Sequence, residues 1–157
     1  MSTEKTNALR ILDRLGLSYE TASYPVDEAD LSAGHVAQVL GLPEEQVFKT
    51  LLLRGDKTGC FTCCIPAPCE IDLKKAARVS GNKKADLVPL KELEPLTGYI
   101  RGGCSPIGMK KAFPTFLDET CGLHERIAVS AGRRGLQALI APGDLLTATE
   151  GALADLI

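Results

Sequence analysis

VFKTLLLRGDKTGCFTCCIP, residues 47–66, is the stretch that decides the fold of this chain. Two runs rich in aliphatic, aromatic and β-branched residues, VFKTLLLRG (47–55) and CFTCCIP (60–66), flank the turn-forming DKTG. Such a pattern predicts an antiparallel β-hairpin. Alternation along the first run leaves apolar residues on both of its faces, so we expect this strand to be covered on both sides.

One charged side chain interrupts this apolar pattern. Lys49 shares a strand face with Val47, Leu51 and Leu53. Burying an ammonium without partners is costly, so such a lysine must find a partner, extend to water or line a cavity. A structural interpretation places Lys49 on an edge strand or beside a carboxylate. A functional interpretation places it in a pocket, where it could hold a phosphate, stabilise a developing oxyanion or act as a base.

Helical patterns occur on both sides of the hairpin in the sequence. The first, near residues 4–15, puts Leu9, Leu12 and Leu15 on one stripe and has Gly16 as its C-cap. Capping residues bound two further segments. We expect additional helices over residues 33–40, between Ser32 and Gly41, over residues 72–81, between Asp72 and Gly81, and over the tail 142–157.

Short apolar runs predict the remaining strands. Helices and strands follow one another without a regular βαβ rhythm, and no repeat or long linker divides the chain. We therefore expect a single α+β domain over residues 1–157, with one curled mixed β-sheet flanked by helices. Besides the hairpin, its strands are expected over residues 18–24, 86–88, 116–118, 126–130 and 136–141.

Composition and charge narrow the classes of function. The 157 residues are 45% hydrophobic and 24% charged, as in an ordinary globular domain, and contain no apolar run long enough to cross a bilayer. The first ten residues lack the apolar core of a secretory signal, so we expect a cytoplasmic protein. A net charge of −2 argues against a protein that binds nucleic acid by bulk electrostatics, and we expect no DNA partner. Clustered basic residues could still form a local phosphate-binding face: Lys74, Lys75, Arg78, Lys83, Lys84, Lys110, Lys111, Arg133 and Arg134.

Six cysteines raise the alternative of a metal or redox site in CFTCCIPAPC. Cys60 and Cys63 form a CxxC pair and Cys69 follows. A zinc site ordinarily needs two such pairs, or histidines at matching spacing, and residues 60 and 63 of a flat strand face opposite ways. We therefore expect reduced thiols packed as small hydrophobes, with no metal and no cofactor.

Two glycine-rich segments are candidate ligand loops. GYIRGGCSPIGMKK (98–111) has little side-chain bulk, so its backbone amides could approach a carbonyl or phosphate oxygen. It has neither P-loop nor dinucleotide-binding spacing. In VSAGRRG (129–135), Ser130 ends a predicted strand and two glycines bracket two arginines. Each segment alone is also compatible with a simple tight turn.

Taken together, these segments resemble the YbaK-type Cys-tRNA(Pro) deacylases, which are related to the editing domain of bacterial prolyl-tRNA synthetases. The resemblance covers nearly all of the chain after about residue 16, with the motifs in family order. The matching segments are GLPEEQVFKTLLL, DLKKAARVSGNKK, TGYIRGGCSPIGMKKAFPT, and VSAGRRGLQ followed by APGDL.

The resemblance implies an enzyme that removes mischarged cysteine from tRNA(Pro), working beside prolyl-tRNA synthetase. The family's essential lysine falls on Lys49, and a tyrosine near the end of the first strand falls on Tyr24. The resemblance therefore implies that both are catalytic residues, with Tyr24 and Ser130 orienting the ester. The remaining positions are implied to contact substrate: Thr50, the GxxxP element Gly102, Gly103, Cys104, Ser105 and Pro106, and then Ser130, Gly132 and Gln137.

The chemistry implied by the resemblance needs no protein nucleophile. The substrate thiol attacks its own ester carbonyl and releases a cyclic thiolactone, while the enzyme orients the ester and stabilises charge on the carbonyl oxygen. This fits the lack of an evident catalytic triad, since His35 and His124 lie in unremarkable contexts.

Position 137 departs from the family pattern. The closest members of the family carry Asp after the RGL motif, whereas this chain has Gln137, which cannot balance an ammonium charge. The identity of the amino acid is therefore less determined than the reaction. Ala-tRNA(Pro), a broader range of aminoacyl-tRNAs, or binding of tRNA or a nucleotide without catalysis remain alternatives.

Overall fold

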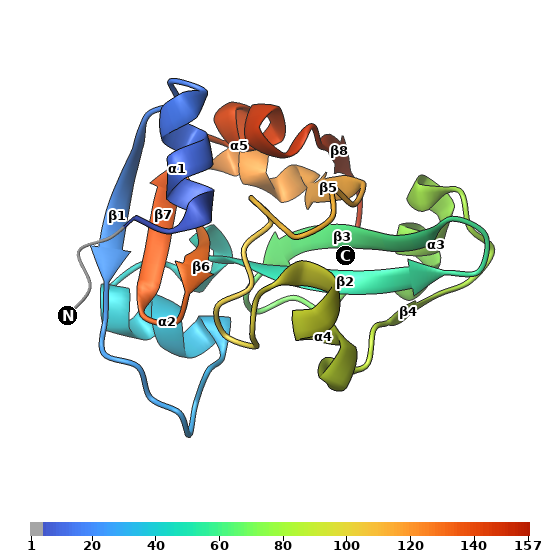
Figure 1. Cartoon of the computed structure of the whole chain (residues 1–157), viewed down its shortest axis with the longest axis horizontal. Coiled ribbons are helices and arrows are strands. Elements are labelled where there is room, and N and C mark those ends of the chain that lie inside the picture. Colours follow the sequence, from blue (N-terminus) through green and yellow to red (C-terminus); the bar gives the residue numbers. More distant parts are fainter. Residues whose placement is uncertain (1–4) are drawn as a thin grey trace.

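The computed structural model describes residues 5–157, whose strands form two hydrogen-bonded sheets (Figure 1). The three-stranded antiparallel sheet has the order β1 (Tyr19–Ser23), β7 (Leu136–Ile140) and β6 (Ile127–Arg133). The five-stranded mixed sheet has the order β4 (Ala85–Leu87), β2 (Phe48–Gly55), β3 (Gly59–Pro66), β5 (Thr115–Asp118) and β8 (Ala152–Ala154). An isolated parallel bridge between Val47 and Ala128 connects the two. The α+β class is confirmed, but the single curled mixed sheet that was expected is two sheets, because among residues 5–157 only this one bridge pairs the strand segments of the two.

The predicted hairpin is confirmed as β2 and β3, paired from Phe48 opposite Pro66 to Gly55 opposite Gly59. Each face of the hairpin belongs to a different hydrophobic cluster. Cys63 packs in the cluster that includes α3 (Leu73–Ser80), whereas Cys64 packs in the cluster that includes α1. The expected burial on both sides of the strand is therefore also confirmed.

The helices α1 (Asn7–Arg14) and α2 (Ala33–Leu40) pack against the three-stranded sheet. Buried residues of α1 contact one face and buried residues of α2 contact the other. Leu15 was expected on the buried stripe but is 48% exposed, because the helix ends at Arg14 and Leu15 is already its C-cap. The expected start at residue 4 lies outside the described residues.

Predicted caps bound α2 and α3. Ser32 Oγ accepts a hydrogen bond from His35 N, and Gly41 ends α2 with φ of 69°. The Asp72 carboxylate accepts from the backbone N–H groups of Lys74 and Lys75 in the first turn of α3, and Gly81 ends that helix with φ of 82°. Among residues 5–157, no helix is both long and apolar enough to cross a membrane.

Two parts of the chain differ from the sequence prediction. The helix α4 (Leu90–Thr97), which contains Pro95, was not among the predicted elements. The tail is helical only in α5 (Pro142–Thr149), so its second half was wrongly predicted. The helix stops at Glu150, which adopts φ of 52°, and β8 then pairs with β5. Short 3-10 turns, η1 (Glu44–Gln46) and η2 (Glu119–Leu123), complete the structure.

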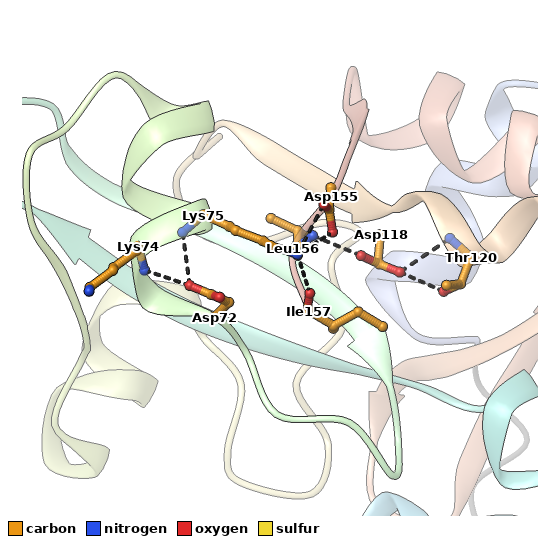
Figure 2. Close-up of polar contacts among 8 residues, drawn as sticks. All are labelled: Asp72, Lys74, Lys75, Asp118, Thr120, Asp155, Leu156 and Ile157. Carbon is orange, nitrogen blue, oxygen red and sulfur yellow. Dashed lines mark hydrogen bonds and ion pairs between the residues drawn. The ribbon is translucent and has the colours of Figure 1, made fainter.

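A buried carboxylate explains why the tail is extended (Figure 2). Asp118, at the end of β5, is fully buried, and its Oδ1 accepts from the Leu156 N–H at 2.9 Å. Its Oδ2 accepts from the Thr120 N–H at 3.2 Å. On the other side of the tail, Asp72 N–H donates to the Leu156 carbonyl at 2.7 Å. These bonds hold the fully buried Leu156 side chain in the cluster under α3.

We expect Asp118→Ala to destabilise the protein by about 2–4 kcal/mol, because it leaves the buried N–H of Leu156 without an acceptor. The midpoint of urea unfolding measures this loss. Asp155→Ala is the matched control, since Asp155 is exposed and its ion pair with Lys75 is worth less than ~1 kcal/mol. Equal midpoints for the two variants would contradict the anchoring role of Asp118.

Candidate functional site

A cavity of about 300 Å³ lies where the two sheets meet. One wall is formed by Val47 and by the first residues of β2, Phe48 to Leu51. Another wall is formed by Ser130 of β6 and Gln137 of β7. Two loops close the remaining sides, one entering α2 and one formed by the glycine-rich segment. These loops and α2 contribute Leu31, Ser32, Ala33, Val36, Arg101, Gly102 and Cys104.

Lys49 is half-buried in the β2 wall of this cavity. Its Nζ donates to the backbone carbonyl of Ala67 at 3.1 Å. Among the ion pairs of residues 5–157, none involves Lys49, so the carboxylate of the structural interpretation is not found there. An ammonium has three donors, and the carbonyl of Ala67 takes one of them. The others remain available to an acceptor in the cavity.

Ser130 and Gln137 are cross-strand partners in the three-stranded sheet. Because paired residues point to the same side of a sheet, both side chains enter the cavity from one face. Ser130 Oγ accepts from the backbone N–H of Gly132 at 3.2 Å, which leaves its hydroxyl proton able to donate. Gln137 is 5% exposed, and its Oε1 has no hydrogen-bond partner.

Hydrogen bonds within the glycine-rich segment, and one hydrogen bond from α1, fix its conformation. Thr97 Oγ1 accepts from the backbone N–H of Tyr99 at 3.0 Å, and the Tyr99 hydroxyl donates to the carbonyl of Ile107. The buried Ser105 Oγ accepts from the Ile107 N–H at 3.2 Å. On the α1 side, Asn7 donates to the carbonyl of Gly108 at 3.3 Å. The loop therefore presents its backbone to the cavity in a defined conformation.

Glycine allows this loop to pack against the turn between β6 and β7. A Cβ on Gly103 would lie 3.0 Å from the backbone of both Arg133 and Arg134, closer than most real contacts. Gly102 has φ of 85°, which favours glycine. The guanidinium Nε of Arg134 also donates to the Arg101 carbonyl at 2.8 Å. The two candidate loops of the sequence analysis thus contact one another.

The structure brings most predicted site residues together. Those that line the cavity are Lys49, Thr50, Gly102, Cys104, Ser130 and Gln137. Tyr24 lies in a smaller neighbouring hollow that shares Leu31, Val36 and Gly102 with the cavity. The other predicted positions do not line the cavity. Gly103, Ser105 and Gly132 pack behind it, and Pro106 lines a separate hollow beside Ile11 and Leu15.

Some cavity residues escaped the sequence analysis. Arg101 lies inside the glycine-rich segment and could have been found as its only cation before Lys110. Leu31 and Val36 carried no such signal, because only folding brings the start of α2 to the glycine loop. The lining contains two cations, Lys49 and Arg101, and no Asp or Glu. The cavity is therefore a locally positive site on a chain with a net charge of −2.

The cysteines offer no evident metal or nucleophilic centre. All six are free thiols, and residues 5–157 contain no group of three or more His, Cys, Asp or Glu placed to hold a metal. Cys104 is the one cysteine in the cavity lining, and burial raises the pKa of its thiol to about 12. At neutral pH this thiol stays protonated and is a poor nucleophile.

Comparison with known protein families identifies the class of domain that has this fold and cavity. The family model described as "Aminoacyl-tRNA editing domain" matches residues 28–148, and the chain belongs to this family. The matched range contains every residue that lines the cavity. The family expected from the sequence motifs is confirmed.

Individual relatives agree with this assignment. "Putative Cys-tRNA(Pro)/Cys-tRNA(Cys) deacylase EbsC" of Enterococcus faecalis (strain ATCC 700802 / V583) is 48% identical over 153 residues, covering 98% of this chain and 93% of that protein. The crystal structure of "a putative trans-editing enzyme for prolyl tRNA synthetase" superposes with a TM-score of 0.83 at 25% identity, covering 98% of both chains. "Hypothetical protein APE2540" shares the fold, with a TM-score of 0.85 at 22% identity over 94% of this chain and 97% of that one.

We expect Gly103→Ala to lower stability by about 1–3 kcal/mol, because its Cβ would press on the backbone of Arg133 and Arg134. The thermal midpoint measures this change. Gly122→Ala is the matched control, since a Cβ at Gly122 would meet nothing within 4 Å. If Gly103→Ala behaved like Gly122→Ala, the close packing of the two loops would be disproved.

Proposed function

We propose that this chain is a trans-editing deacylase that removes mischarged cysteine from tRNA(Pro). The observation that carries this proposal is the meeting of Lys49, the glycine loop, Ser130 and Gln137 around one cavity. The cavity is small, and Val36, Phe48 and Leu51 make part of its lining apolar. Both properties suit an aminoacyl group of modest size. The name of the Enterococcus relative points to the same class of substrate.

In this proposal Lys49 stabilises negative charge near the scissile ester. Its ammonium is oriented by the Ala67 carbonyl and keeps donors for the ester carbonyl oxygen or the terminal phosphate. Hydroxyl donors from Thr50 and Ser130 line the same cavity and would orient the ester. Tyr24, from the adjacent hollow, would contact the terminal nucleotide rather than the aminoacyl group.

The proposed nucleophile is the thiol of the substrate itself. Its sulfur forms a bond to the ester carbonyl carbon, the bond from that carbon to the ribose oxygen breaks, and the thiol proton ends on the ribose oxygen. The products are a cyclic thiolactone of cysteine and uncharged tRNA. The cavity lining supports this route because it contains no histidine and its one thiol, Cys104, stays protonated. Binding then accelerates the reaction by orienting two groups of one molecule.

The tRNA and its synthetase are the proposed partners. Lys49 and Arg101 give the cavity a positive charge suited to the terminal phosphate region of a tRNA. The chain as a whole is weakly acidic, so tRNA affinity outside the cavity is expected to be low. Recruitment by prolyl-tRNA synthetase would supply the missing affinity and the choice of tRNA.

Deacylation of Ala-tRNA(Pro) is the main alternative, and it would require water as nucleophile. If prolyl-tRNA synthetase alone provides tRNA selectivity, this chain by itself would not distinguish the two tRNAs and would also deacylate Cys-tRNA(Cys). A binding module without catalysis would retain charged tRNA and leave the ester intact.

Lys49→Ala is expected to lower kcat/KM for Cys-tRNA(Pro) by about 100- to 1000-fold, because it removes the cation that stabilises the developing oxyanion. Single-turnover deacylation of Cys-tRNA(Pro), Ala-tRNA(Pro) and Cys-tRNA(Cys) measures the effect and the substrate preference. Lys57→Ala, at the exposed β2–β3 turn, is the matched control and keeps full activity. Unchanged turnover by Lys49→Ala would refute the role of Lys49, and an intact ester with the unaltered protein would refute deacylation.

Cys104→Ala is expected to retain turnover within about threefold of the unaltered protein, because the thiol of Cys104 is protonated and supplies no nucleophile. In contrast, S-methylcysteinyl-tRNA(Pro), which has no free thiol, should resist cleavage by the same protein. Mass spectrometry of the protein during turnover provides a direct check. An acyl adduct on Cys104 would replace the substrate-assisted route with covalent catalysis.

A further inference from the structure

The strand β6 departs from regular pairing directly after Ser130, a residue of the cavity lining. Its register with β7 shifts between Ser130 and Arg133, and the two residues in between form a bulge, here called the β6 bulge. Within it, Gly132 has φ of 103°, and its N–H donates to Ser130 Oγ at 3.2 Å. Because a bulge redirects the side chains beside it, the direction of the Ser130 hydroxyl depends on where the β6 bulge lies.

The ring of Tyr99 lies against the β6 bulge. A Cβ on Gly132 would be 3.2 Å from Tyr99 Cε1, closer than most real contacts, so glycine is what lets the backbone approach the ring this closely. From α1, Thr6 Oγ1 donates to the carbonyl of Ala131 at 2.5 Å. The β6 bulge is therefore held by a ring and by a hydrogen bond, each from a different part of the chain.

The glycine-rich segment in turn fixes Tyr99. The side chain of Tyr99 is buried, and its hydroxyl donates to the carbonyl of Ile107, eight residues later. Its backbone N–H donates to Thr97 Oγ1 at 3.0 Å. Burial raises the pKa of Tyr99 to about 12, so the hydroxyl keeps its proton and remains a donor at neutral pH. With its hydroxyl and its backbone both bonded, the ring has little freedom to move away from Gly132.

We propose that Tyr99 is a positioning residue that sets the orientation of Ser130 for deacylation. The inference rests on the proposed function, because it concerns the orientation of the ester in that reaction. Tyr99 does not line the cavity, so it acts through the β6 bulge rather than by touching the substrate. The contacts run from the carbonyl of Ile107 to the Tyr99 hydroxyl, from the Tyr99 ring to Gly132, and from the Gly132 N–H to Ser130 Oγ.

The backbone on both sides of Tyr99 is shaped to receive its side chain. A Cβ on Gly108 would lie 3.1 Å from the Tyr99 hydroxyl, and Gly108 has φ of 76°. Two glycines in the left-handed region, Gly108 and Gly132, thus meet one tyrosine from two segments. In a reaction whose substrate carries its own nucleophile, orientation of the ester is the main contribution of the protein. A displaced Ser130 should therefore lower kcat more than it weakens binding.

Tyr99→Leu should lower kcat for Cys-tRNA(Pro), per folded molecule, by about 10- to 100-fold and change KM by less than about threefold. Tyr99→Phe keeps the ring against Gly132 and loses only the bond to Ile107, so its kcat should recover to within about fivefold of the unaltered protein. Tyr19→Leu is the matched control. Its hydroxyl donates to Asp13 at 2.8 Å, away from the cavity lining, so kcat should not change.

A double-mutant cycle with Ser130→Ala separates positioning from a loss of stability. If Tyr99 acts through Ser130, Tyr99→Leu should lower kcat by less than about threefold once residue 130 is changed to alanine. The same fold-loss in both backgrounds would overturn the inference. Unchanged kcat in Tyr99→Leu, or full activity of Ser130→Ala, would overturn it as well.

Failure of the proposed function has a separate signature, because the unaltered protein would then cleave none of the three aminoacyl-tRNAs. The positioning is in that case tested by hydrogen exchange of the Gly132 amide, which donates to Ser130 Oγ. Tyr99→Leu should accelerate this exchange by about tenfold or more, and Tyr19→Leu should not. Unchanged exchange at Gly132 would reject the inference whatever the activity of the protein.

Discussion

The bridge between Val47 and Ala128 is the contact on which the arrangement of the site depends. It joins the two sheets beside Lys49, so a strand of one sheet faces Ser130 and Gln137 of the other. β4 pairs with β2 only from Leu53 to Gly55, which leaves the Lys49 end of β2 without a second neighbouring strand. The cavity lies along this unpaired stretch. A site built on strand residues and one bridge is held more rigidly than a site built on loops alone.

The glycine-rich segment and the β6–β7 turn gain their order from contacts with one another. Gly103 packs on the backbone of the β6–β7 turn, and Arg134 of that turn donates to the carbonyl of Arg101. Neither loop is long enough to form a core, and each is stabilised by the other and by α1. This mutual support presents Gly102 and Cys104 to the cavity at low conformational cost. Orientation is the main contribution required of an enzyme whose substrate carries its own nucleophile.

The charged groups that line the cavity are all cations. Lys49 and Arg101 provide positive charge in a chain of net charge −2, so the attraction for a charged tRNA end is local. Gln137 adds no negative charge that would neutralise this positive charge. An amide at this position therefore preserves the positive character of the site.

The sequence by itself determined most of the secondary structure and the family, because capping residues, the DKTG turn and two-residue alternation act within short stretches of chain. It also identified Lys49 as an anomaly, since a charge on an apolar strand face is visible without the fold. Only the tertiary structure decided that the tail leaves its helix at Glu150, because Leu156 gains a buried site beside Asp118 that no local pattern encodes. In the same way, only folding brought Leu31 and Arg101 to the cavity and left Gln137 Oε1 without a partner. Those features depend on contacts between residues far apart in the chain, and burial and hydrogen bonding across such distances are set by the packing of the whole domain.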